Sequence, residues 1–364
     1  ERYVESKMDF LEQSGVTVDR SDPSKYLYAD EAENYLAGKS TDPWDMIFRQ
    51  GLQTTCDLSI SGRTKTTKYY VSGSLVKIKG VLENDNMERY SMRVNLDTDI
   101  TEWLKIGLTS NFSRRDLSGV AASVASAYRS SPYGNWFDDK GNVLRYIVTA
   151  EQADSNPLYN TKLTDEDELY NNLFSNIYAI VDVPFINGLS YRLNFSPNFD
   201  WNHTYSFLKQ DPYRTDNMTS ASKYNYSNFQ WVLENILTYD KKFGENHALN
   251  LTLLYGRDYY KNESTTANSS NMAQDQLGYN LLSLGQTVSV NSYASSVSGI
   301  SSMLRANYIL KHKYLLTGTI RRDGSSVFAK NNKFATFPSG SVAWIASEEP
   351  FLKGSSFIDM LKLR

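Results

Sequence analysis

Cysteine and histidine are scarce in this 364-residue sequence, which contains one Cys and three His. The single cysteine, Cys56, excludes a disulfide framework and any metal site built from several cysteines. The histidines, His203, His247 and His312, are too far apart in sequence to supply metal ligands at local spacing. We therefore expect no metal site and no cofactor.

An excess of either charge is also missing. The chain has 38 basic and 41 acidic side chains and a formal net charge of -3, so it lacks a broad basic surface and we expect no nucleic-acid partner. No run of about 18 apolar residues occurs, which excludes a membrane-spanning helix, because such a helix has to cross about 30 Å of hydrocarbon. A membrane barrel is not excluded, since a spanning strand needs only about ten residues with every second one apolar.

The sequence is rich in aromatic residues and in segments in which apolar and polar side chains alternate. It has 26 Tyr, 16 Phe and 6 Trp, a composition that favours β-strands and membrane interfaces. At residues 90–100 apolar side chains recur at almost every second position with polar ones between them. Roughly eleven such segments follow one another, many of about ten residues, whereas ordinary strands have about five or six. The sequence therefore predicts an all-β, antiparallel protein with long strands.

The connections between the predicted strands alternate in length. Short ones are expected at residues 62–65, 101–102, 184–188, 241–246 and 311–313, and long ones at 78–87, 115–168, 202–222, 261–295 and 323–333. Ten residues in a strand tilted by about 45° rise roughly 23 Å, close to the apolar band of an outer-membrane barrel. Such barrels have short periplasmic turns and long extracellular loops. We therefore predict a transmembrane β-barrel whose apolar side chains face lipid.

Three segments carry a family resemblance. They are residues 41–51 (TDPWDMIFRQG), 59–97 (SISGRTKTTKYYVSGSLVKIKGVLENDNMERYSMRVNLD) and 321–351 (RRDGSSVFAKNNKFATFPSGSVAWIASEEPF). All three resemble segments of SusC/RagA-type TonB-linked outer-membrane transporters, in the order found in that family. The sequence departs from the family pattern at Arg63, where a second glycine is frequent, and in the long loops.

The resemblance implies a fold, a location and partners. It implies a partial antiparallel transmembrane β-barrel, about 11–12 strands of a 22-stranded barrel, in the bacterial outer membrane. It also implies transport of oligosaccharides or oligopeptides instead of enzymatic catalysis, with a SusD-like surface lipoprotein as lid. Energy is expected from the TonB complex, acting through parts of the protein that precede this chain. A plug domain before the chain and further strands after it are implied as well.

The chain divides into two expected regions. Residues 1–52 are expected to form an extracellular loop with short helices at 30–39 and 44–49, because they precede a strand that runs into a short turn. Residues 53–364 are expected to form the partial barrel.

Two groups of side chains are candidates for function. Charged residues on the polar strand faces are expected to line the barrel lumen, and these are Arg93, Asp97, Asp99, Arg192, Arg305 and Arg321. Aromatic faces near polar groups suit flat sugar or peptide surfaces. The candidates of this kind in the predicted long loops are Tyr128, Tyr133, Trp136, Phe137, Asp138, Trp201, His203, Tyr205 and Tyr213. Packing within the loops is the simpler explanation for this second group.

Catalysis has little support in the sequence. No G-x-S-x-G motif occurs, and the acidic residues at 138–139 and 165–168 are interpreted as solvated loops and not as calcium ligands or glycosidase carboxylates. Two alternatives remain open: a soluble secreted all-β protein that binds or degrades carbohydrate, and a passive porin or adhesin barrel. The first predicts that rows such as Met92, Leu96 and Leu251 are buried between two layers. The second predicts no plug or TonB-contacting sequence in the full-length gene.

Overall fold

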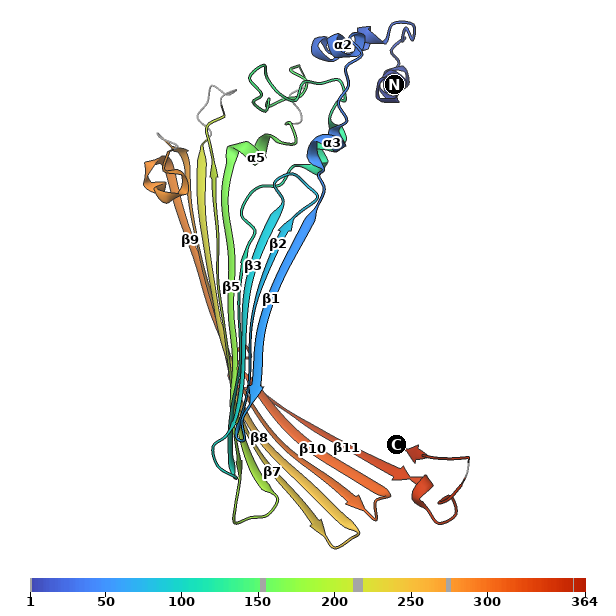
Figure 1. Cartoon of the computed structure of the whole chain (residues 1–364), viewed down its shortest axis with the longest axis vertical. Helices are drawn as coiled ribbons and strands as arrows, with labels where there is room; N and C mark the ends of the chain where they lie inside the picture. The colour runs from blue at the N-terminus through green and yellow to red at the C-terminus, as the bar shows by residue number, and fades with distance from the viewer. Residues whose placement is uncertain (1, 151–154, 212–218, 273–275, 356) are drawn as a thin grey trace.

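The computed structural model describes residues 2–150, 155–211, 219–272, 276–355 and 357–364, whose strands form one antiparallel sheet. Twelve strands follow one another in chain order, each hydrogen-bonded to its neighbours in sequence (Figure 1). They are β1 (Leu52–Arg63), β2 (Thr67–Lys79), β3 (Asn86–Asp99), β4 (Leu104–Asp116), β5 (Thr164–Asp182), β6 (Leu189–Leu208), β7 (Ser220–Phe243), β8 (His247–Met272), β9 (Gly285–Leu310), β10 (Tyr314–Ser325), β11 (Phe334–Ile345) and β12 (Lys362–Leu363). This meander confirms the predicted all-β antiparallel fold.

Helices occupy the connections and the N-terminal segment. They are α1 (Arg2–Gln13), η1 (Pro23–Tyr26), α2 (Ala29–Leu36), α3 (Pro43–Ile47), α4 (Val124–Arg129), α5 (Tyr159–Leu163), η2 (Gly278–Asn280), η3 (Leu282–Leu284) and η4 (Ala346–Glu348). In α2 the Glu31 side chain accepts the backbone N–H of Tyr28, which completes a capping box. In α3 Asp42 is the N-cap and Pro43 takes the first helical position. The sequence predicted α2 and α3 but not α1.

The connections are sorted by side. The short turns at 64–66, 100–103, 183–188, 244–246 and 311–313 lie at one end of the sheet, which is also the end of the C-terminus (Figure 1). The other described connections between β2 and β11, including those at 80–85 and 326–333, leave the opposite ends of their strands, on the side of the N-terminal helices. The predicted alternation between the two ends is confirmed, but the predicted difference in length holds only in part. The connection at 80–85 is as short as the turn at 183–188, and the long connection at 346–361 follows the end of β11 that lies with the short turns.

Several strands extend further than the sequence predicts. β6 continues to Leu208, β8 to Met272, and β9 begins at Gly285, so much of the loop expected at 261–295 is strand. The alternating pattern requires one face of a strand to be apolar. Residues 262–272 (NESTTANSSNM) are polar at almost every position, as suits a strand with water on both faces. A strand of that composition resembles a loop in sequence.

The register gives the sheet one polar and one apolar face. Directly paired residues lie on the same face, and every pairing keeps the positions in phase from β1 to β11. One face, here called the polar face, contains Arg93 together with its partners Ser72 and Asn111. The opposite face, the apolar face, contains Met92 and Leu96.

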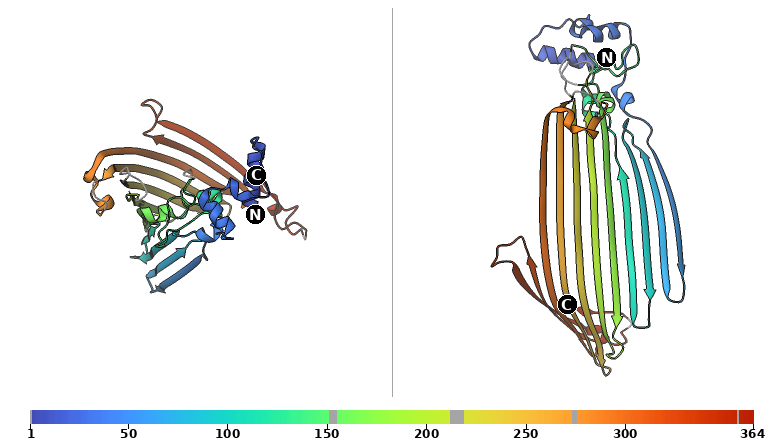
Figure 2. Two further views of the ribbon diagram at one scale, coloured as in Figure 1. Left: turned by 90° about the horizontal axis from the view of Figure 1, so that it is seen from above. Right: turned by 90° about the vertical axis from the view of Figure 1, so that its left-hand side faces the viewer.

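The apolar face is not covered by a second layer among the described elements. Met92 is 51% exposed and Leu96 is 37% exposed, and Figure 2 shows the sheet curving through an open arc with the N-terminal helices gathered beyond one end. A soluble sandwich would have buried these rows between two layers. No helix within the described ranges is long and apolar enough to cross a membrane.

Most of the buried core lies beyond the sheet, where residues 2–51 pack against residues 117–150 and 155–163; together we call these the surface cap. A smaller buried cluster of Phe207, Ala221 and Met272 lies at the ends of β6, β7 and β8. One cluster contains Ile47, Ala122, Ala127, Trp136, Ile147, Val148 and Leu158. A second contains Val4, Met8 and Tyr133. Arg49 connects the surface cap to the β2–β3 hairpin, because its Nε donates to the Gly80 carbonyl at 3.0 Å.

Candidate substrate-binding site

The polar face of the sheet carries all six charged residues that the sequence assigns to the lumen. They are Arg93, Asp97 and Asp99 on β3, Arg192 on β6, Arg305 on β9 and Arg321 on β10, and the register brings them to one side. An outer-membrane barrel turns its polar side chains to the interior. The shared face is therefore the arrangement that the lumen prediction requires.

A row of contacts crosses this face from β3 to β6. The Tyr178 hydroxyl donates to Asp97, and Cζ of Arg192 lies 4.8 Å from the centre of the Tyr178 ring. Arg192 Nε donates to Asn194 Oδ1 at 2.8 Å. Gly107 on β4 makes this row possible, because a Cβ there would lie 2.3 Å from Cζ of Tyr178. The row holds the Tyr178 ring flat across the sheet.

Two pairs of opposite charges lie on the polar face. Lys105 Nζ lies 3.4 Å from Asp99 Oδ1, and Arg321 Nε lies 2.8 Å from Asp323 Oδ2. Both pairs are largely exposed and add little to stability. Their effect is on the chemistry of the face, which carries both positive and negative groups along its height. Such a surface suits neutral, polar solutes better than ions of one sign.

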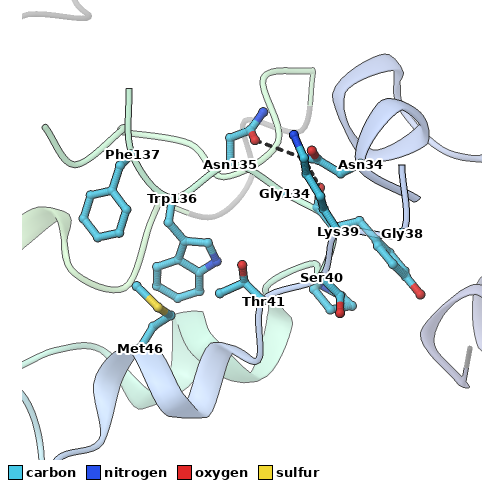
Figure 3. A pocket seen from close by; sticks show the side chains of 12 residues that line it. Asn34, Gly38, Lys39, Ser40, Thr41, Met46, Gly134, Asn135, Trp136 and Phe137 are labelled. Atoms are coloured by element: carbon cyan, nitrogen blue, oxygen red, sulfur yellow. Dashed lines mark hydrogen bonds between the residues drawn. The ribbon is translucent and has the colours of Figure 1, made fainter. Parts of the chain in front are cut away.

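A cavity of about 560 Å³ lies in the surface cap (Figure 3). Its volume falls in the range of roughly 300–1,000 Å³ that is usual for small-ligand sites. It is lined by Asn34, Gly38, Lys39, Ser40, Thr41, Met46 and residues 132–137. The lining thus comes from two segments about a hundred positions apart in sequence.

Hydrogen bonds hold the two walls of the cavity together. Asn34 Nδ2 donates to the Tyr133 carbonyl at 2.8 Å and to Asn135 Oδ1 at 3.0 Å. The Thr41 N–H donates to the Pro132 carbonyl at 2.7 Å. These bonds fix the spacing of the walls and so the shape of the cavity.

Trp136 brings an unused donor to the cavity. Its side chain is 4% exposed, and its indole Nε1 is buried without a hydrogen-bond partner. Figure 3 shows the indole nitrogen directed toward Thr41 at the cavity wall. A buried donor without a partner costs about 1–3 kcal/mol, so an acceptor oxygen bound here is favoured. Lys39 adds the single formal charge of the lining.

The local fold of the 132–148 segment depends on close packing and a turn. At Gly134 a Cβ would lie 2.0 Å from Cγ2 of Ile147, so only glycine allows this approach. Asp138 Oδ1 accepts the N–H groups of Lys140 at 2.9 Å and Asn142 at 2.8 Å. Its Oδ2 accepts Asn142 Nδ2 at 2.9 Å, and this bond is the main reason that the pKa of Asp138 is lowered. Both oxygens of Asp138 are therefore engaged in the turn.

Glu31 fixes the surface cap from its buried position. The side chain is fully buried and accepts hydrogen bonds from the Tyr3 hydroxyl at 2.9 Å, Lys7 Nζ at 2.9 Å and the Tyr28 N–H at 3.0 Å. Burial alone would raise the pKa of Glu31, but hydrogen bonds from Ser131, Lys7 and Tyr28 offset that effect and lower it. The carboxylate therefore stabilises the fold in its ionised form.

The structure separates the predicted substrate contacts in the 128–138 segment. Tyr133, Trp136 and Phe137 line the cavity, and Asp138 follows directly in the turn. Tyr128 lies on α4, is 80% exposed and is not part of the lining. Tyr213 lies outside the described residues.

The expected loop position of Trp201, His203 and Tyr205 is wrong. All three lie in β6, and the register with β5 and β7 puts them on the apolar face, away from the charged row. Trp201 stacks on Phe199 at 5.0 Å and on Phe112 at 6.0 Å between ring centres. Such a cluster is typical of the aromatic girdle of an outer-membrane barrel. The sequence misled because β6 continues as a strand into residues of mixed polarity.

Comparisons with known proteins agree with this geometry. The chain is 32% identical to TonB-dependent receptor P3 of Formosa agariphila over 373 residues, which cover 97% of this chain and 36% of that protein. It is 26% identical to TonB-dependent receptor SusC of Bacteroides thetaiotaomicron, with 93% of this chain and 35% of that protein covered. The solved RagAB peptide importer in its closed-closed state shares the fold with a TM-score of 0.80 at 20% identity, over 96% of this chain and 42% of that chain. The chain belongs to the SusC/RagA-type TonB-dependent receptors.

Membership in the SusC/RagA-type receptors confirms three expectations. The fold is part of an antiparallel membrane barrel, the location is the bacterial outer membrane, and these relatives are named as receptors and importers instead of enzymes. No family model matches the chain. The chain spans about a third of the length of the curated relatives, 36% of receptor P3 and 35% of SusC.

Sequence reasoning missed the N-terminal half of the cavity in this SusC/RagA-type chain. Asn34, Lys39 and Thr41 meet the 132–137 segment only in three dimensions, so no local pattern links them. The one available signal was the family-like segment 41–51, which contains Thr41 and Met46.

The acidic run at 165–168 is also placed differently from its expected loop. It opens β5, and the register puts Asp165 and Asp167 on the apolar face and Glu166 and Glu168 on the polar face. The pleat thus divides the four carboxylates between opposite sides. Within the described part of the chain, no group of three or more His, Cys, Asp and Glu side chains could hold a metal ion.

Proposed function

We propose that this chain is part of the outer-membrane barrel of a TonB-dependent importer of oligosaccharides or oligopeptides that works with a SusD-like surface lipoprotein. The single observation that carries the proposal is the register, which brings the six charged lumen candidates to one face and rows of apolar residues such as Met92 and Leu96 to the other. Such a wall encloses a polar path through lipid. Transport along it requires no covalent chemistry from the wall.

The chemistry of the cavity supports the proposed substrate classes. Its amide, hydroxyl and indole groups, with Phe137 at the rim, match the hydroxyl and carbonyl oxygens and the flat surfaces of sugars and peptides. RagAB is a peptide importer, and this likeness supports the peptide class. The mixed charges of the polar face support neutral oligomers of either class.

Uptake by intact cells tests the proposal. Cells with the full-length gene, cells without it, cells without TonB and cells without the SusD-like lipoprotein are compared for uptake of a fluorescent oligosaccharide mixture and a fluorescent oligopeptide mixture. We expect that uptake of one mixture falls to background in all three deletion strains. Uptake that survives deletion of the receptor gene would contradict the importer function. Uptake that survives only the loss of TonB would show a passive porin instead.

A further inference from the structure

Strand β9 extends well beyond its neighbour β10, so that part of its edge has no partner strand. β9 begins at Gly285, but β10 pairs with it only from Gly299, which lies opposite Ser325. Residues 285–298 are paired with β8 on one side, and no described strand pairs with them on the other. The free edges of β1 and β12 lie at the ends of the strand order, whereas this edge lies inside it. Further strands added to the ends of the sheet therefore leave this edge free.

The exposed edge has none of the usual protection. Residues 285–298 (GQTVSVNSYASSVS) contain no charged residue and no proline, the two devices with which proteins most often block a free strand edge. The side chains of Val288, Val290 and Tyr293 are 49%, 69% and 59% exposed. At about 3.3 Å per residue the edge is roughly 46 Å long. A long, uncharged edge of this kind is a template for another strand.

The backbone groups that are free on this edge can be identified. The Ser326 N–H donates to the Ser298 carbonyl at 2.9 Å, and the Ser298 N–H donates to Ser326 Oγ at 2.9 Å. The backbone of Ser298 therefore points away from β8. Because this direction alternates along a strand and the register with β8 is unbroken over 287–298, every second residue presents its N–H and C=O to the open side. These residues are Val288, Val290, Ser292, Ala294 and Ser296.

The free edge stands above the lipid. From Leu310 to Ile300 the side chains of β9 on the apolar face are mostly large and apolar, and the ten residue steps between these two residues rise roughly 23 Å. Above Ile300 the same face carries Ser298 and Ser296. The edge therefore begins near the outer surface of the membrane and rises away from it.

A second copy of the barrel does not fit this edge. Two barrels in one membrane are related by rotation about the membrane normal, so both β9 strands run toward the periplasm. Tilted by about 40° in opposite directions, they cross at about 80°. Paired strands are rotated by only about 20–25° relative to each other.

We propose that an extended segment next to the lipid anchor of the surface lipoprotein adds to this edge as a strand, antiparallel to β9. The inference rests on the proposed function, which supplies the lipoprotein. The polypeptide next to a lipid anchor leaves the bilayer and runs outward along the barrel wall. β9 runs inward from Gly285 to Leu310, so the two directions are opposite. Main-chain hydrogen bonds provide the affinity, and Ser292, Ala294 and Ser296 are small enough to let the segment approach.

Amide hydrogen exchange of the full-length receptor, alone and co-purified with the SusD-like lipoprotein, tests this pairing. The amides of Val288, Val290, Ser292 and Ala294 are expected to exchange at least about tenfold more slowly in the complex, because each gains a main-chain partner. The odd-numbered amides between them bond to β8 and are expected to be protected in both samples. Unchanged exchange of the edge in a complex that forms would overturn the pairing. Protection already present in the receptor alone would overturn it too, since another segment would then fill the edge.

Two variants of the full-length receptor separate the contribution of the backbone hydrogen bonds from that of the side chains. Ser292→Pro removes an N–H that points to the open side and leaves the β8 bonds intact, so lipoprotein affinity is expected to fall about tenfold. Ser292→Ala keeps the N–H and is expected to bind as the wild type does. Wild-type affinity in Ser292→Pro would refute the pairing alone. If Ser292→Pro fails to insert, Val290→Lys, which places a charge on the same edge, takes its place with the same expectation.

A wild-type receptor that retains no lipoprotein would overturn the proposed partnership, and the pairing with it. The two failures are therefore distinguishable. Loss of binding in the proline variant with retention in Ser292→Ala supports both.

Discussion

At the scale of single residues, Trp136 combines a packed ring with a hydrogen-bond donor that has no partner in the structure. Its ring belongs to the buried cluster that contains Ile47 and Val148, whereas its N–H has no partner. The ring and the N–H can be separated by mutation, because phenylalanine retains an aromatic ring and removes the donor. The consequences for binding and for folding then differ.

We predict that Trp136→Phe weakens substrate binding about fivefold, because a hydrogen bond of about 1 kcal/mol is lost. The measurement is calorimetric titration of the full-length receptor with the substrate class found in the uptake assay. Tyr128→Phe is the matched control, since Tyr128 is 80% exposed outside the cavity, and it is expected to leave the affinity unchanged. Wild-type affinity in Trp136→Phe would show that the cavity does not bind the substrate.

Glu31 gives the surface cap a predictable pH dependence. Its pKa in the folded protein lies below the ordinary value of 4.5, so its stabilising effect is fully present above about pH 4.5 and is lost as the pH falls through the lowered pKa. Hydrogen exchange over residues 2–36, corrected for intrinsic rates, is expected to be faster at pH 3 than at pH 7. Glu31→Gln is expected to lose about 1–3 kcal/mol of local stability at pH 7 and most of the pH response. The same pH response in both proteins would show that another group is responsible.

At the scale of single elements, sequence prediction succeeded where a local pattern carried the information. The alternation around Met92 identified β3, and the capping residues of α2 and α3 identified those helices. α1 was missed because long-range contacts stabilise it: Val4 and Met8 pack with Tyr133. The outer ends of β8 and β9 were missed because a strand with water on both faces has no apolar side to alternate. The sequence predicted only one wall of the cavity. Tyr133 and Trp136 stand out as aromatic residues in a loop, but nothing in the local sequence shows that the 34–46 segment packs against them.

The position of Trp201 on the apolar face of β6 leads to a test at the same scale. Trp201 stacks between Phe199 and Phe112, so we expect it to lie at the lipid interface in the full-length receptor. In vesicles of brominated lipid, the quenchable tryptophan fluorescence is expected to fall in Trp201→Phe. Trp136→Phe, which alters the surface cap, is expected to leave the quenchable part unchanged. Equal quenching in the wild type and Trp201→Phe would show that Trp201 does not contact lipid.

At the scale of the whole molecule, the structure combines the β-sheet, which forms a wall, with the surface cap, and the two parts differ in chemistry. The wall has almost no buried core of its own, because its apolar face is open and lipid is expected to cover it. The surface cap has its own buried clusters and the cavity, and its N-terminal helices lie beyond one end of the sheet (Figure 2). The family resemblance supplied the outer-membrane location, whereas the register supplied the assignment of faces. In the proposed function, substrate capture belongs to the surface cap and passage to the polar face of the sheet.

The assignment of faces is the central claim, and a nitroxide scan along residues 90–97 of β3 tests it most directly. Single cysteines are introduced into the full-length receptor in a cysteine-free background, in which Cys56 is replaced by serine, and the labelled protein is reconstituted in bilayers. We predict that accessibility to oxygen, which concentrates in lipid, peaks at the even positions that include Met92 and Leu96. Accessibility to a water-soluble nickel complex is predicted to peak at the odd positions that include Arg93 and Asp97. Two profiles that rise and fall together, or a nickel profile that is high at both sets of positions, would contradict the account.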